Sequence, residues 1–148
     1  MITQDFRDML GQLKSSGAEF LVVGAHALAA HGKPRATGDL DIWVRRSEEN
    51  AERLWRALAE FGAPMEQFTR ADLLAENAVI QLGVAPGRID LMTGLSGVEF
   101  DQAWQNRDML IVDGLEVPVI GRAEFVRNKR ATGRAKDRLD ADELEQSQ

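Results

Sequence analysis

The chain has 148 residues, of which 44% are hydrophobic and 28% charged, and its formal net charge is −6 at pH 7. These values are typical of a soluble globular domain with a real core, and the acidic balance argues against broad nonspecific binding to nucleic acid. Because the chain has no cysteine, disulfides, zinc–thiolate sites and thiol nucleophiles are excluded. We expect one cytoplasmic domain over residues 1–148, since we find neither a membrane-spanning run nor the basic start of a signal peptide.

Hydrophobic periodicity and turn residues divide the chain into alternating helices and strands. The first part is expected to contain a helix at 3–15, a strand at 19–23, a short helix at 25–31, a strand at 39–44 and a helix that Ser47 caps at its start. The second part is expected to contain strands at 78–84 and 88–92, a short helix at 99–106, a hairpin of 109–112 and 115–120, and helices at 122–132 and 136–145. This order predicts an α/β (α+β) domain, with a mixed β-sheet flanked by helices and with helices at the C-terminal end.

Three aspartates fall on two of these predicted strands. Asp39 and Asp41 are two positions apart on the strand at 39–44, so their side chains share one face. Asp90 lies on the strand at 88–92, and it completes a cluster of three carboxylates if the two strands pair. Neighbouring carboxylates repel each other, and such a cluster binds hard divalent cations, Mg²⁺ or Mn²⁺, through oxygen. The alternative is that these acids are solvated or form salt bridges.

A glycine turn follows the first predicted strand. Gly24 allows the backbone to approach a phosphate closely, and the free amides at the start of the next helix, from Ala25, can face an anion. The alternative is a tight strand–helix turn without a ligand. Arg35 and Thr37 come just before the paired acids, where they could contact phosphate or fix the loop.

A local basic segment near the C-terminus contrasts with the acidic chain as a whole. Residues 122–138 contain seven bases and two acids, enough to neutralise a triphosphate or a nucleic-acid backbone. Lys129 is our first choice for a phosphate ligand, because it follows Phe125 by one helical turn and so lies near the core-facing side. The alternative for the segment is a solvated helix face.

The acids and the glycine turn together resemble the nucleotidyltransferase superfamily typified by DNA polymerase β. The residues that carry this resemblance are Val22-Val-Gly-Ala25, Asp39-Leu-Asp41 and Arg88-Ile-Asp90. Two further stretches resemble the bacterial branch that includes AbiEii-type toxins and related uncharacterised proteins. They are Gly24-Ala-x-Ala…His31-Gly…Arg35-x-Thr37-x-Asp39-x-Asp41 and Lys129…Arg134-x-Lys136-Asp137…Asp140…Leu144. The chain departs from the superfamily at Ala25, where Gly or Ser is usual, so only a backbone N–H is available there.

The resemblance implies a metal-dependent transfer of a nucleoside monophosphate from an NTP to an acceptor hydroxyl on RNA, protein or a small molecule. Mg²⁺ or Mn²⁺ would be the cofactor, and a cognate toxin or antitoxin protein is a further candidate partner. Asp39, Asp41 and Asp90 are the expected catalytic residues and metal ligands; the expected nucleotide and phosphate ligands are Gly24, Ala25, Arg35, Thr37 and Lys129. The alternative is a catalytically weak nucleotide-binding or regulatory module of the same fold. A Rossmann oxidoreductase fits poorly, because there is no G-x-G-x-x-G.

Overall fold

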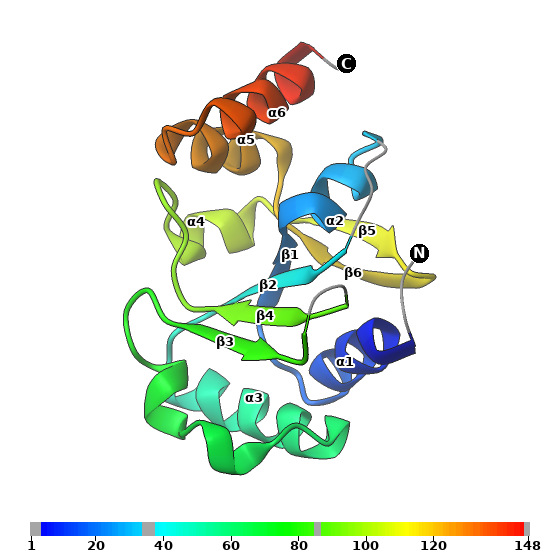
Figure 1. The fold of residues 1–148 in the computed structure, drawn as a ribbon, viewed down its shortest axis with the longest axis vertical. Coiled ribbons are helices and arrows are strands. Elements are labelled where there is room, and N and C mark those ends of the chain that lie inside the picture. The colour runs from blue at the N-terminus through cyan, green and yellow to red at the C-terminus, as the bar shows by residue number, and fades with distance from the viewer. Residues whose placement is uncertain (1–3, 34–37, 85–86, 147–148) are drawn as a thin grey trace.

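The computed structural model describes residues 4–33, 38–84 and 87–146 (Figure 1). The first half contains α1 (Gln4–Ser15), β1 (Phe20–Val23), α2 (Gly24–Ala30), β2 (Leu40–Val44), α3 (Glu48–Phe61) and the short 3₁₀ helices η1 (Met65–Gln67) and η2 (Arg70–Leu73). The second half contains β3 (Val79–Leu82), β4 (Ile89–Met92), α4 (Phe100–Gln105), β5 (Asp108–Val112), β6 (Leu115–Val119), α5 (Arg122–Ala131) and α6 (Ala135–Gln146).

The strands form one mixed sheet. Over the described residues it has six strands in the order β3-β4-β2-β1-β6-β5. β1 is antiparallel to β2 and parallel to β6, whereas β2 is parallel to β4. In Figure 1, α2, α4, α5 and α6 lie on one side of the sheet and α1 and α3 on the other. The predicted fold class, a mixed sheet flanked by helices with helices at the C-terminal end, is confirmed.

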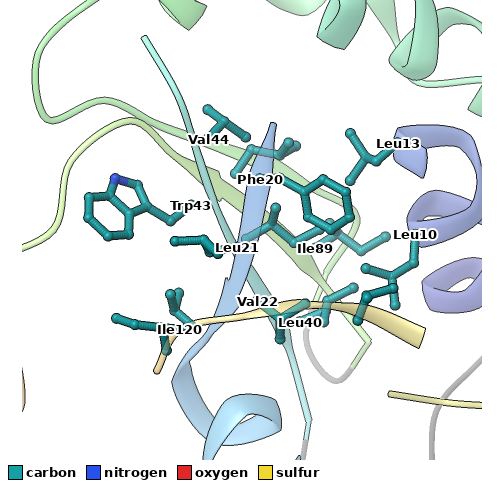
Figure 2. Close-up of a cluster of buried hydrophobic side chains, with 14 of the residues drawn as sticks. Leu10, Leu13, Phe20, Leu21, Val22, Leu40, Trp43, Val44, Ile89 and Ile120 are labelled. Atoms are coloured by element: carbon teal, nitrogen blue, oxygen red, sulfur yellow. The ribbon is translucent and has the colours of Figure 1, made fainter. Parts of the chain in front are cut away.

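The hydrophobic core extends over both faces of the sheet, with α1 and α3 on one face and buried residues of α2, α4, α5 and α6 on the other. Alternation along β2 buries Leu40, Ile42 and Val44 completely, as expected for one face of a central strand. Figure 2 shows Leu10 and Leu13 of α1 pointing toward a Phe20 side chain on β1. Burying each such side chain contributes roughly 1.5–3 kcal/mol, so the central strands are fixed firmly in register.

Local signals set most of the element ends. The Ser47 side chain accepts a hydrogen bond from the backbone N–H of Asn50 at the start of α3, and Gly62 ends that helix in a left-handed conformation. Asp113 and Gly114 both have positive φ, as a two-residue hairpin turn between β5 and β6 requires. The predicted strand at 78–84 is too long, because Gly83 has φ +84° and leaves the extended conformation. The predicted start of the first helix, Thr3, lies outside the described residues.

Candidate functional site

The register of the sheet places the three acids beside one another. β2 and β4 run parallel, and Asp41 is the direct partner of Asp90 in their ladder. On its other side Asp41 is paired with Val23, the last residue of β1. Asp39 lies just before β2, where its Oδ1 accepts a hydrogen bond of 3.0 Å from the backbone N–H of Arg88. The structure therefore brings Asp39, Asp41 and Asp90 to one end of two neighbouring strands, as the alternation pattern predicted.

The Arg88 side chain lies among these acids. Its Nε donates to Asp90 Oδ1 at 2.8 Å and its Nη2 to Asp90 Oδ2 at 3.1 Å, while Nη2 is 3.4 Å from Asp39 Oδ2. Such a two-bonded pairing is the strong form of an arginine–carboxylate interaction. The sequence put Arg88 and Asp90 on one strand face, but we assigned no role to Arg88. The two-residue spacing was the signal that could have revealed the pairing.

The environment of Asp41 disfavours the charged form of its carboxyl group. Burial, and then the charges of Asp90 and Asp39, raise the pKa of Asp41 to about 6, against the opposing charges of Lys129 and Arg88. A carboxyl whose pKa rises in this way is disfavoured in its charged form. Burial is the largest of these causes, and the charges of the two neighbouring acids add to it.

The turn after β1 is shaped by Gly24. This residue has φ +68°, and a Cβ placed on it would lie 2.3 Å from Oδ2 of Asp41. Both observations require glycine: the conformation is costly for other residues, and the space is filled by a carboxylate. Gly24 is thus needed for the close approach of the turn to Asp41, and α2 starts directly from it.

A cavity of about 400 Å³ connects this turn to the C-terminal helices. Its lining residues are Gly24, Ala25, Leu28, Asp41, Phe125, Lys129, Lys136, Asp137 and Asp140. Of the three acids, which all lie in the described part of the chain, Asp41 alone lines this cavity. Lys129, predicted as a phosphate ligand, does line it. Sequence reasoning did not select Lys136, whose place depends on how α6 packs on α5.

Lys129 is held by a buried acid of α6. Its Nζ is 3.4 Å from Asp137 Oδ1 and 5.2 Å from the centre of the Phe125 ring. Asp137 also accepts hydrogen bonds from the Thr132 hydroxyl at 2.7 Å and from Arg134 Nε at 2.8 Å. Burial would raise the pKa of Asp137, but these contacts and the two positive charges lower it overall. Asp137 therefore pairs with two nearby bases, Lys129 and Arg134.

Lys136 has a different environment in the same cavity. Its side chain is exposed, and among residues 4–33, 38–84 and 87–146 none forms an ion pair with it. A lysine that forms no ion pair leaves its three donors to water or to a ligand. Among the described residues, the cavity therefore combines Lys129, which is paired with Asp137, with Lys136, which forms no ion pair.

The acid cluster contains the type of ligand that binds a divalent cation, but its side chains are not arranged around one metal position. Three carboxylates are the kind of ligand that Mg²⁺ or Mn²⁺ prefers. Within the described part of the chain, however, no three acidic or histidine side chains converge as a metal site. The guanidinium of Arg88 holds both oxygens of Asp90 and one of Asp39. The cation that these carboxylates contact in this arrangement is the guanidinium of Arg88.

Two of the predicted phosphate ligands, Arg35 and Thr37, lie outside the described residues. Trp43 is buried and packs edge-on against Phe100 at 5.0 Å, so it belongs to the interface between β2 and α4 rather than to an open ligand surface. No helix in the described ranges is long and apolar enough to cross a membrane.

Comparison with known proteins gives a match in three dimensions only. No protein-family model matches the chain, and no curated protein sequence matches it. Its structure is similar to the crystal structure of a putative nucleotidyltransferase from Thermotoga maritima, with a TM-score of 0.59 and 18% sequence identity. The superposition covers 98% of this chain and 93% of the other. This likeness shows the nucleotidyltransferase-like fold; the resemblance to the AbiEii-type branch stays a prediction.

Proposed function

We propose that this chain is a metal-dependent nucleotidyltransferase, which moves a nucleoside monophosphate from an NTP to an acceptor hydroxyl. The observation that carries the proposal is the cavity in which Asp41 and the turn at Gly24 share one lining with Lys129 and Lys136. Carboxylates beside lysines are the groups that a metal–triphosphate complex needs. The nucleotidyltransferase-like fold supports the same reaction class.

Different residues would bind the phosphate tail of the NTP and the metal ion. Lys129 and Lys136 would neutralise the phosphate tail, and the backbone amides at Gly24 and Ala25, which line the same cavity, would approach it. Asp39, Asp41 and Asp90 would hold Mg²⁺ or Mn²⁺. When bound, the divalent ion would polarise the phosphate and offset the charge that develops on it.

The transfer itself is a displacement at the α-phosphate. The acceptor oxygen forms a bond to the α-phosphorus, the bond from that phosphorus to the bridging oxygen breaks, and pyrophosphate leaves. The proton of the acceptor hydroxyl passes to a carboxylate, for which Asp90 is our choice because it lies next to Asp41 in the ladder. Asp90 can accept the proton only after its two oxygens are released by Arg88.

The acceptor and the biological setting follow less directly from these residues. RNA, a protein and a small molecule each offer a hydroxyl, and a toxin–antitoxin pair in the cytoplasm is the setting that the sequence resemblance suggests. A second candidate function is a catalytically weak nucleotide-binding or regulatory module. Two observations favour it: Ala25 lacks a hydroxyl for phosphate, and Arg88 neutralises Asp90.

The test is a screen of each labelled NTP with Mg²⁺ or Mn²⁺ against tRNA, candidate proteins and small hydroxyl compounds. We expect labelled product from wild type and a loss of about 10²-fold or more in Asp41→Asn, the size seen when a group that stabilises transition-state charge is removed. Asp8→Asn, on the exposed face of α1, is the control and should keep full activity. A wild type that binds NTP but transfers to no acceptor, while Ala25→Ser is active, would establish the binding module instead.

A further inference from the structure

The strand β5 ends the sheet and has one unpaired edge. Among the described residues it is the last strand in the sheet order and pairs with β6 alone (Figure 1). Its ladder with β6 runs without interruption from Asp108 to Val112. Over these residues the strand has no proline, lysine or bulge, three features by which proteins protect a sheet edge. β5 therefore keeps a regular edge on which another strand can pair.

The register with β6 shows which backbone groups of β5 face outward. Met109 is paired with Pro118, and proline has no N–H, so this pair is of the non-hydrogen-bonded type. The two types of pair alternate along an antiparallel ladder, and Ile111, paired with Glu116, is therefore of the same type. The backbone N–H and C=O groups of Met109 and Ile111 consequently point to the open edge.

The side chains of the same two residues are apolar and exposed. Met109 is 47% exposed and Ile111 62% exposed, and they share one face because side chains alternate along a strand. A charged residue lies two positions beyond each of them: Arg107, over the ring of Trp104, and Asp113, in the hairpin turn. Every second residue from 107 to 113 is therefore, in order, positive, apolar, apolar and negative.

A second copy of β5 is complementary to this edge in one register. When two antiparallel β5 strands are centred on Leu110, Met109 of each copy lies opposite Ile111 of the other, and their outward backbone groups exchange hydrogen bonds. Arg107 then lies opposite Asp113 at both ends, and opposite charges in that position stabilise a strand pair. A centre at Met109 would instead place Arg107 opposite Ile111, and a centre at Ile111 would place Met109 opposite Asp113.

We propose that β5 pairs antiparallel with β5 of a second copy of this chain, in the register centred on Leu110. On the other face of the strand Leu110 meets its own copy, and the exposed Asp108 lies opposite Val112 near the strand end. The contact is small, so the dimer is weak, with a Kd in the micromolar range. The inference is independent of the proposed function, because no residue of β5 is among the described residues that line the cavity.

This pairing also fixes how the two candidate sites are presented. The two-fold axis that relates antiparallel edge strands is perpendicular to the sheet, so equivalent faces of the two copies lie on the same side. The helices α2, α5 and α6, which contribute to the cavity lining, lie on one side of the sheet (Figure 1). Both cavities of the dimer therefore lie on the same side of the joined sheet.

Sedimentation of the full chain over a range of concentrations measures the association. Ile111→Lys replaces an exposed apolar side chain at the edge by a charge, and the two-fold axis makes the change twice. The dimer Kd should therefore rise by at least about tenfold. The matched control is Val79→Lys on β3, the other edge strand, where Val79 is 54% exposed. It should change the Kd by less than about twofold, since it lies far from the proposed contact.

A cysteine cross-link tests the register directly, because the chain has no cysteine of its own. In the proposed register Leu110 lies opposite its own copy in a non-hydrogen-bonded pair, with Cα atoms about 4.5 Å apart, a separation that a disulfide can bridge. Leu110→Cys should therefore form a covalent dimer on oxidation. Ile111 lies diagonally from its own copy at about 7–8 Å, beyond the reach of a disulfide, so Ile111→Cys should stay uncross-linked.

Three outcomes overturn the inference. A wild type that stays monomeric at every concentration would leave the edge of β5 to an extended segment of a different protein. A dimer that Ile111→Lys leaves intact, or that Val79→Lys dissociates instead, would place the contact elsewhere. Equal cross-linking of the two cysteine variants would exclude the register centred on Leu110. If Ile111→Lys does not fold, Met109→Lys puts the charge on the opposing position of the same pair, and an unchanged Kd in that variant would again overturn the inference.

Discussion

The cavity has two walls that are built by different means. The acid wall consists of Gly24 and Asp41, which line the cavity, together with the neighbours of Asp41 outside that lining, Asp39, Arg88 and Asp90. The helix wall consists of Phe125, Lys129, Lys136, Asp137 and Asp140. The acid wall is positioned by backbone pairing, since β2 lies between β1 and β4 in the middle of the sheet. The helix wall is held by side chains, above all by the buried Asp137, which receives three polar contacts across the junction of α5 and α6.

The two walls also differ in their charge balance. On the helix wall the pKa of Asp137 is lowered overall, because hydrogen bonding and nearby bases outweigh the effect of burial. On the acid wall the pKa of Asp41 is raised by burial and by its acidic neighbours. The helix wall is therefore satisfied by its own residues, whereas the acid wall is left with a repulsion that a bound cation would relieve. This contrast indicates that the acid wall bears the chemistry and the helix wall mainly its support.

The largest effect is expected from Asp137→Ala. The substitution leaves the partly buried Lys129 without its paired carboxylate and removes the hydrogen bond from the Thr132 hydroxyl. Breaking a buried pair by removing one partner typically costs about 3–5 kcal/mol. Because Arg134 is largely exposed, we expect a loss of about 3 kcal/mol in the free energy of unfolding, measured with urea. Asp142→Ala, which removes an exposed partner of Arg130, should cost less than about 1 kcal/mol. Similar losses in both variants would contradict the assignment of Asp137 as the main support of the helix wall.

A smaller effect is expected from Gly24→Ala on the acid wall. The new Cβ would meet Oδ2 of Asp41 at 2.3 Å in a conformation with φ +68°, and such backbone strain alone costs roughly 1–3 kcal/mol. We expect a loss of about 2 kcal/mol in the free energy of unfolding. The matched control is Gly11→Ala in α1, where a Cβ meets nothing within 4 Å and alanine should stabilise the helix by up to about 1 kcal/mol. Opposite signs for the two substitutions are the decisive result; a neutral Gly24→Ala would refute the close approach to Asp41.

The same contrast explains how much the sequence could predict. Strand alternation is a local pattern, so the two-residue spacing of Asp39 and Asp41 was enough to predict that they share a face. The pairing of β2 with β4 is a contact distant in sequence and had to be assumed. The helix wall depends on how α6 folds back on α5 around Gly133, which has φ +74°. No local sequence pattern predicts how α6 is oriented relative to α5. Lys136 was therefore missed, while the Lys129 prediction depended on its place one helical turn after Phe125, on the local cluster of bases and on the family resemblance.

The third prediction concerns pH and Asp41. Its pKa is about 6 in the folded chain and 3.8 in the unfolded reference, so the folded state binds more protons between these values. Stability should therefore fall as the pH rises through that window. Asp41→Asn removes the repulsion and should be more stable than wild type above about pH 6, by roughly 1–2 kcal/mol after some allowance for solvent screening. Below about pH 4 the difference should vanish. Urea unfolding at several pH values measures this, with the exposed Asp8→Asn as control; a difference that does not change with pH would contradict the assignment.

The smallest effect on folding, and a clear effect on binding, is expected from Lys136→Ala. Lys136 is exposed and makes no ion pair within the described residues, so the free energy of unfolding should change by no more than about 0.5 kcal/mol. If its ammonium contacts the triphosphate, nucleotide affinity should fall about tenfold, since a hydrogen bond to a charged group contributes about 1.5 kcal/mol or more.

Lys129→Ala should lower both quantities, because Lys129 also compensates the charge of the buried Asp137. Lys14→Ala is the control for charge alone: Lys14 donates to the backbone of Glu116, on β6, and lies outside the lining of the cavity among the described residues. Titration of each variant with an NTP analogue and Mg²⁺ separates the three lysines. The helix wall contributes to binding if both Lys129→Ala and Lys136→Ala weaken it more than Lys14→Ala does. Equal affinities in all three variants would reduce the helix wall to a support for the fold and leave the acid wall as the whole site.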